Sequence, residues 1–199
     1  GTFDGQNHTI SNLKITKVSN YSGLFGNTGG TIKNFTVKGD ITLSSDGLHI
    51  GGAVGCADGA VISNVASYVN ISNTEGELKH VGGVIGSLET KETFVDKCVY
   101  YGTLDVDNSV DCIGGVIAYS NGGGRISNCA NHGTVTTSAQ GAYTGGILGY
   151  VNNSNPTLRN CYNYGTVSNG DITNHCGAII GWARNYLSLI HISEPTRPE

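Results

Sequence analysis

One column of side chains along this sequence has the chemistry of a metal site. Two residues before each of six recurring glycine-rich blocks stand Asn20, His49, His80, Cys112, Tyr143 and His175. Histidine nitrogen and cysteine sulfur are zinc ligands. However, we expect no carboxylate beside the imidazoles to orient them, as zinc-bound histidines usually require. The alternative, an outward stack of polar and aromatic side chains, is the one we predict. We therefore expect no metal site and no cofactor.

An acidic segment, LDVDNSVD, offers oxygen ligands of the kind that Ca²⁺ prefers. The four candidate ligands are Asp105, Asp107, Asn108 and Asp111. The segment lacks the spaced glycine and the terminal glutamate of an EF-hand loop. A solvated acidic loop is therefore the interpretation that we favour over a calcium site.

Hydrolysis of glycosidic bonds needs two carboxylates about 5–9.5 Å apart. When the repeats are aligned, Asp96 falls in a position that holds Ser, Lys or Arg in the other copies, and Asp40 aligns with Asn and Thr. Neither has an acidic neighbour in its column. G-x-S-x-G and H-E-x-x-H motifs are also absent from the sequence. We predict that this chain is not an enzyme.

Four aromatic residues recur just before a turn and form the best candidate for a ligand-binding stripe. They are Tyr68, Tyr101, His132 and Tyr164. One interpretation is that their exposed rings stack on sugars, which makes host or environmental glycans or proteins the candidate partners. The other is pairing between rings of adjacent repeats, worth about 0.2–1 kcal/mol per pair, and we favour it.

These side chains must be positioned by a repeat that recurs every 29 to 32 residues. Its first block reads SGLFG, GGAVG, GGVIG, GGVIA, GGILG and GAIIG, starting at Ser22, Gly51, Gly82, Gly114, Gly145 and Gly177. Short segments rich in Ile, Val, Thr and Tyr between glycines indicate strands. The period predicts an all-β fold, a parallel β-helix (β-solenoid) of about six coils with three short strands each. Tight corners or close backbone approach are expected at Gly23, Gly26, Gly52, Gly55, Gly83, Gly86, Gly115, Gly146, Gly149 and Gly181.

A second block supplies two inward columns and a bend between them. One column is Leu13, Phe35, Val65, Cys98, Cys129 and Cys161, and the other, three residues earlier, is Ile10, Ile32, Ile62, Val95, Ile126 and Leu158. Between them lie Asn12, Asn34, Asn64, Lys97, Asn128 and Asn160. Asparagine tolerates left-handed backbone, so we expect a bend and an Asn ladder, with an irregularity at Lys97. The buried cysteines, and most of the six in the chain, are expected to be free thiols.

Composition narrows the class further. Glycine accounts for 31 of 199 residues, charged residues for 13%, and the net charge is −4. Interior glycine costs a helix roughly 1 kcal/mol, so long helices are disfavoured. The weak charge argues against a nucleic-acid partner, and the absence of a G-X-Y period excludes collagen. No apolar run approaches the ~18 residues of a membrane span. A turn-rich, all-β chain remains.

The six glycine blocks, with the GTFDGQNHTISNL opening, resemble the GLUG-motif repeats of bacterial surface proteins over residues 1–186. That resemblance implies a non-catalytic repeat region of a secreted or cell-surface protein, either an adhesin-like surface or a structural stalk. A carbohydrate-active β-helix and the spacer repeats of a large surface peptidase are the alternatives. We expect residues 1–186 to form a single solenoid truncated at both ends. Residues 187–199 resemble a translated sequencing adapter.

Overall fold

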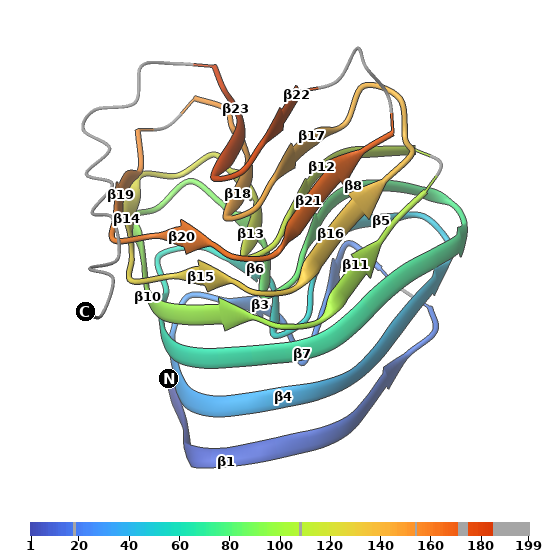
Figure 1. Cartoon of the computed structure of the whole chain (residues 1–199). Coiled ribbons are helices and arrows are strands. Elements are labelled where there is room, and N and C mark those ends of the chain that lie inside the picture. The colour runs from blue at the N-terminus through green and yellow to red at the C-terminus, as the bar shows by residue number, and fades with distance from the viewer. Residues whose placement is uncertain (18, 108, 154, 171–174, 185–199) are drawn as a thin grey trace, which may run out of the picture.

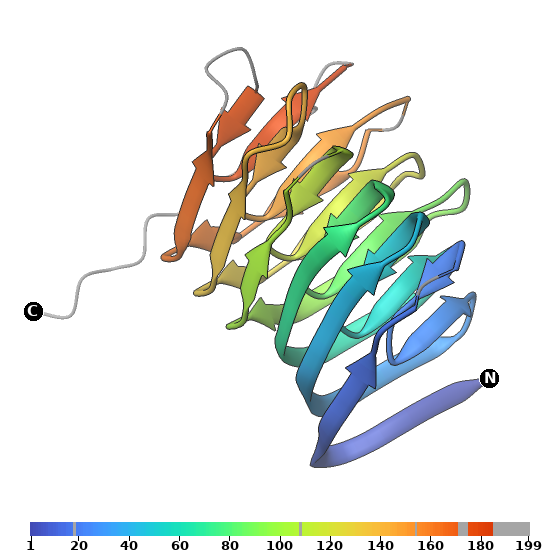
Figure 2. The same ribbon diagram turned by 90° about the vertical axis from the view of Figure 1, so that its right-hand side faces the viewer.

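The protein is an all-β, parallel β-solenoid of six coils in the computed structural model, which describes residues 1–17, 19–107, 109–153, 155–170 and 175–184. Figure 1 shows the coils stacked from β1 to the last strand, and Figure 2 shows the same stack from the side. These ranges contain no helix and so none that could cross a membrane. The predicted fold class is confirmed.

Three parallel sheets run the length of the stack. Sheet A contains β1 (Thr2–Ile15), β4 (Thr31–Ser44), β7 (Val61–Glu75), β10 (Thr93–Tyr100), β11 (Thr103–Asp105), β14 (Gly124–Ser127), β15 (Ala130–Asn131), β16 (Thr134–Thr137), β19 (Thr157–Arg159), β20 (Tyr162–Asn163) and β21 (Thr166–Asn169). Sheet B contains β2 (Tyr21–Ser22), β5 (Gly47–Gly51), β8 (Glu77–Gly82), β12 (Ser109–Gly114), β17 (Tyr143–Gly145) and β22 (His175–Gly177). Sheet C contains β3 (Phe25–Thr28), β6 (Val54–Ala57), β9 (Ile85–Leu88), β13 (Ile117–Ser120), β18 (Leu148–Val151) and β23 (Ile180–Ala183).

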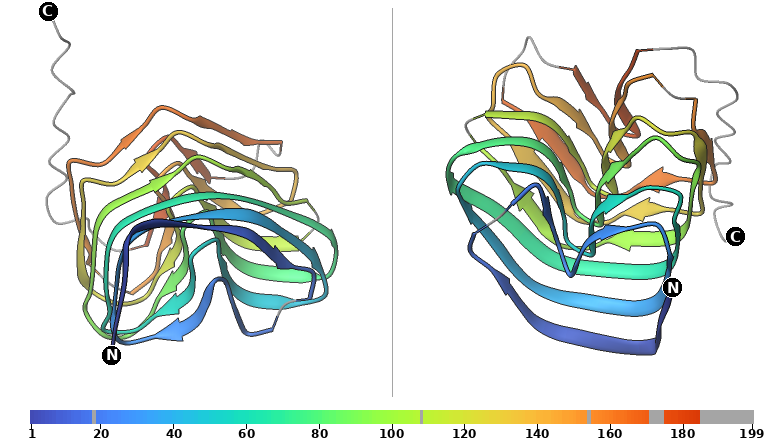
Figure 3. Two further views of the ribbon diagram at one scale, coloured as in Figure 1. Left: turned by 90° about the horizontal axis from the view of Figure 1, so that it is seen from below. Right: turned by 180° about the vertical axis from the view of Figure 1, so that it is seen from behind.

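Each coil passes through sheet A, then B, then C, and the chain enters sheet A of the next coil. In the first three coils the sheet A segment is one bent strand of 14 or 15 residues, whereas the later coils divide it into two or three. The first three coils thus have the expected three strands, of which the sheet A strand is long, not short, and the later coils have more than three. Sheets B and C turn toward the interior and meet there, as the view down the stack shows (Figure 3).

The core consists of columns of apolar side chains in register between coils. Ile32 pairs with Ile62, and Ile62 with Val95, and the column continues through Ile126 to Leu158. All five are at most 3% exposed. Along β4 and β7 buried and more exposed positions alternate, because one face of sheet A packs against the core and the other faces solvent.

The first coil has a different register from the one that the sequence pattern predicts. His8, not Leu13, pairs with Phe35, and Phe3, not Ile10, pairs with Ile32. Leu13 instead pairs with Gly39 after a register shift. The TISNL segment resembles the later blocks in composition, but TFDGQNH is their structural counterpart.

The glycine blocks form the inner corner between sheets B and C. At Gly52, Gly83, Gly115 and Gly146, a Cβ atom would collide with a backbone carbonyl oxygen of the next coil. At Gly83 it would also collide with the Tyr100 ring. Ala178 takes the equivalent place in the sixth coil. Side-chain volume is thus excluded where two backbones approach most closely.

We predict that Gly83→Ala lowers the free energy of unfolding by about 2 kcal/mol or more, because the new methyl group overpacks a fully buried corner. Gly123→Ala is the matched control, since the added Cβ would only touch Glu92 Cγ at 3.8 Å. Denaturant titration of both variants checks this. Equal stability of the two variants would contradict the role of the corner.

Candidate functional site

The bend in sheet A is made by residues in the left-handed conformation. Asn34, Asn64, Lys97, Asn128 and Asn160 have φ between 50° and 59°. Asn64 Nδ2 donates to Asn34 Oδ1 at 3.0 Å, and Asn160 Nδ2 donates to Asn128 Oδ1 at 3.2 Å. The expected bend and Asn ladder are present. In the first coil the ladder member is Asn7, whose Oδ1 accepts from Asn64 at 3.1 Å, and not Asn12.

Lys97 interrupts the Asn ladder, as expected. The adjacent Asp96 takes over part of its hydrogen bonding, because its Oδ1 accepts from Asn128 Nδ2 at 2.7 Å and from Ser127 Oγ at 2.8 Å. The backbone of Lys97 keeps the left-handed φ of 53°, although lysine gains nothing from it. The Lys97 side chain is exposed.

The aromatic stripe is a continuous stack of rings on the exposed face of sheet A. Ring centroids are 4.6 Å apart for Tyr68 and Tyr101, 5.1 Å for Tyr101 and His132, and 5.4 Å for His132 and Tyr164. The interplanar angles are 11°, 14° and 24°. Lys38 Nζ lies 4.9 Å from the Tyr68 ring centroid at the lower end. The rings therefore cover one another's faces and present their edges and polar atoms to solvent.

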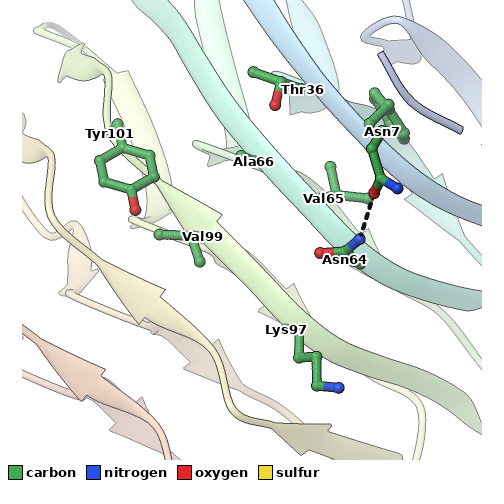
Figure 4. A pocket seen from close by; sticks show the side chains of 9 residues that line it. Asn7, Thr36, Asn64, Val65, Ala66, Lys97, Val99 and Tyr101 are labelled. Atoms are coloured by element: carbon green, nitrogen blue, oxygen red, sulfur yellow. Dashed lines mark hydrogen bonds between the residues drawn. The ribbon is translucent and has the colours of Figure 1, made fainter. Parts of the chain in front are cut away.

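A shallow hollow of about 140 Å³, the outer hollow, lies between this stripe and the Asn ladder (Figure 4). Its floor includes the small side chains of Thr36, Ala66 and Val99, which pair with one another across β4, β7 and β10. Tyr101 lines it on one side.

On its other side the outer hollow is lined by Asn7, Asn64 and Lys97. The outer hollow thus lies between the Asn ladder and the aromatic stripe, two columns that the sequence pattern indicates independently of each other. The spacing of the repeats alone does not predict the outer hollow, because the hollow depends on the size of the floor side chains between the two columns.

The histidine column lies in the seam between sheets B and C. His49 Nδ1 is 2.8 Å from His80 Nδ1, and His80 stacks on Tyr119 of sheet C with a centroid distance of 4.0 Å. Glu89 Oε1 lies 3.6 Å from His49 Nε2. Within the described residues, Glu89 Oε1 and Ser87 Oγ are buried without a hydrogen-bond partner.

Three expectations about this column need correction. His49 is buried, at 6% exposure, rather than outward. A carboxylate, Glu89, does stand beside it, directly after the end of β9 of sheet C. The first member is Tyr21, which pairs with His49 and stacks on it with an interplanar angle of 5°, and not Asn20. In the part of the chain that the structure describes, no group of three or more His, Cys, Asp or Glu residues is arranged to hold a metal ion.

The acidic segment does not gather its carboxylates. Asp105 Oδ1 accepts from Thr136 Oγ1 at 2.9 Å, Asp107 Oδ1 accepts from Ser138 Oγ at 2.6 Å, and Asp111 pairs with Lys79 at 3.4 Å. Asn108 lies outside the described residues. The first contact joins neighbouring coils within sheet A, the second joins them just beyond the ends of β11 and β16, and the third lies on sheet B. The segment therefore behaves as part of the inter-coil hydrogen bonding.

The cysteines are all free, and five of the six are buried. Cys98, Cys129 and Cys161 lie in the inward column, at 0%, 0% and 8% exposure. Burial raises the pKa of the Cys112 thiol well above its ordinary value, so this thiol stays protonated. These cysteines act as small apolar residues of the core and the seam.

The chain resembles a known protein only in part. It is 37% identical over 92 residues to Halomucin of Haloquadratum walsbyi, a match that covers 44% of this chain and 1% of Halomucin. The chain therefore spans a very small share of this relative's length. No family model matches the chain. No solved structure matches it either.

We predict that Lys97→Asn raises the free energy of unfolding by about 1 kcal/mol, because asparagine tolerates left-handed backbone and extends the Asn ladder. The reverse exchange, Asn64→Lys, serves as the matched control and should lower the free energy of unfolding by a similar amount. Urea unfolding of both variants measures the effect. A loss of stability in Lys97→Asn would contradict this account of the bend.

The two histidines in the seam between sheets B and C predict that the stability of the fold decreases at acidic pH. Burial lowers the pKa of His49 from 6.5 to about 4, and burial with the charges of His49 and Lys79 lowers the pKa of His80 to about 3. Both histidines stay neutral in the folded chain, whereas the unfolded chain binds protons below pH 6.5. Stability is therefore full above pH 6.5 and falls as the pH drops, by about 2 kcal/mol for each histidine at pH 5.

Denaturant unfolding between pH 7 and pH 5 measures this loss, above the range where most carboxylates titrate. The double variant His49→Phe, His80→Phe should show a flatter profile, whereas His8→Gln, at an exposed position, should keep the parent slope. An unchanged slope in the double variant would show that other groups cause the pH dependence.

Proposed function

We propose that this chain is a non-catalytic repeat segment of a secreted or cell-surface protein, and that it acts as an adhesin-like binding surface. The similarity to Halomucin and the repeat fold fit a surface repeat role. The resemblance of the glycine blocks to GLUG-motif repeats of bacterial surface proteins points the same way. Binding partners on this proposal are glycans or proteins of a host or the environment.

One observation carries the binding role: on the exposed face of sheet A, polar columns run parallel to the solenoid axis. Asn7 and Asn64 of the Asn ladder and Tyr101 of the aromatic stripe line opposite sides of the outer hollow (Figure 4). Their spacing repeats with the coils, about 4.8 Å apart along the axis. A surface with this periodicity suits a partner that is itself extended and repetitive, and it needs no mobile loop to complete it.

A non-catalytic role is supported by the environment of Asp96 and Asp40, the two aspartates that the sequence offers as candidate catalysts. Asp96 Oδ1 accepts hydrogen bonds from Ser127 and Asn128, and Asp40 Oδ1 accepts one from Asn70 Nδ2 at 3.0 Å. Both oxygens thus belong to the inter-coil ladders of sheet A.

A structural stalk is the second candidate, and the aromatic stripe favours it. Because the ring faces are stacked on one another, they are not available to sugar rings, and the stripe ties four coils together. Such contacts between coils resist bending and separation of the stack.

Screening the purified segment against an array of glycans and surface proteins, with an assay for released reducing ends on every glycan bound, separates these roles. We expect binding without bond cleavage. Binding to nothing on the array would favour the stalk. Cleavage that is lost in Asp96→Asn but kept in the control Asp111→Asn would overturn the non-catalytic proposal.

A further inference from the structure

The outer hollow has a single charged side chain in its lining, the Lys97 ammonium group, and no carboxylate. The nearest acidic residue in sequence, Asp96, is held by Ser127 and Asn128. Within the described residues, Lys97 forms no ion pair, whereas Lys33, Lys79 and Lys91 each pair with an aspartate. The charge that lines this hollow is therefore positive.

The remaining groups around the outer hollow favour hydroxyl-rich ligands. Asn7 and Asn64 present amides, and Tyr101, 40% exposed, presents its ring edge and phenolic hydroxyl. Asn7 takes part in the ladder only through its Oδ1 and keeps its N–H donors, whereas Asn64 Nδ2 donates to both Asn7 and Asn34 and Asn64 keeps acceptor capacity at its Oδ1. The floor of Thr36, Ala66 and Val99 is small enough to let a ligand approach these groups.

The shape of the outer hollow selects an extended ligand. Its floor residues come from three successive coils, so the hollow runs along the axis with a repeat of about 4.8 Å. This repeat is close to the length of one sugar residue in an extended polysaccharide chain. Because the faces of the stripe rings are covered, recognition must use polar groups and charge, not stacking of sugars on rings.

We propose that the outer hollow binds an extended polysaccharide that carries carboxylates, a uronate-type chain, lying along the solenoid axis with a carboxylate at Lys97. This rests on the proposed binding function and names its ligand class and site. The Asn ladder and Tyr101 contact the sugar hydroxyls, and Lys97 supplies the charge selectivity. Lys97, the residue that interrupts the Asn ladder, is thus the position that distinguishes acidic from neutral polysaccharides.

Calorimetric titration with a short oligogalacturonate tests the proposal, with the same oligomer methyl-esterified as the neutral probe. We expect the parent to bind the acidic oligomer about tenfold more tightly than the esterified one, with an affinity that falls as salt is added. Lys97→Asn should remove this preference, and its fold is checked independently by the gain in stability predicted above. Lys79→Asn removes the same charge from sheet B and should leave the preference intact.

Two results would overturn the proposal. One is equal affinity of the parent for both oligomers. The other is an equal loss of the preference in Lys97→Asn and in Lys79→Asn, because that result would indicate general charge attraction and not a site at Lys97. A parent segment that binds neither oligomer but binds other glycans on the array would overturn this ligand assignment and leave the proposed binding function standing. Binding to none of them would overturn both.

Discussion

In-register parallel pairing between coils is the constraint on which the rest of this structure depends. Each residue lies beside its counterpart about 4.8 Å away, so a side chain must be compatible with a copy of itself above and below. Like charges stacked in this way repel, whereas amides, aromatic rings, small apolar groups and glycines stack well. The low charge content, the Asn ladder, the aromatic stripe and the cysteine column all follow from this requirement.

The inner corner adds the second constraint. Because sheets B and C meet inside each coil, their backbones approach so closely that glycine is needed at the corner, and the side chains beyond it close the seam. His80 stacks on Tyr119 and Tyr143 on Tyr150, which are contacts between the two sheets. The neutral form of His49 and His80 is favoured because packing in this seam removes much of their contact with water. The acid sensitivity of the fold is thus a consequence of its architecture.

The repeat predicted most of the fold because its signals are local. Asparagine at each bend indicates left-handed backbone, and glycine pairs indicate close approach, without knowledge of any distant residue. The predicted register of the first coil is wrong because TISNL matches the later blocks in composition. Leu13 precedes Phe35 by only 22 residues, which is shorter than the repeat of 29 to 32 residues. The contact of Glu89 with His49 was missed for a different reason. Those residues belong to different sheets and to neighbouring coils, and only the inward turn of sheets B and C brings them together.

The same reasoning separates the parts of the surface that the fold determines from the parts left free for function. Ring faces and most ladder amides are committed to neighbouring coils, so they contribute to stability whatever the segment binds. Lys97 differs, because asparagine would suit its left-handed backbone better and would continue the ladder. Folding alone therefore does not account for lysine there. A side chain that is unfavourable for its backbone, exposed, and placed beside the outer hollow is where binding chemistry can be added to a solenoid without disturbing its core.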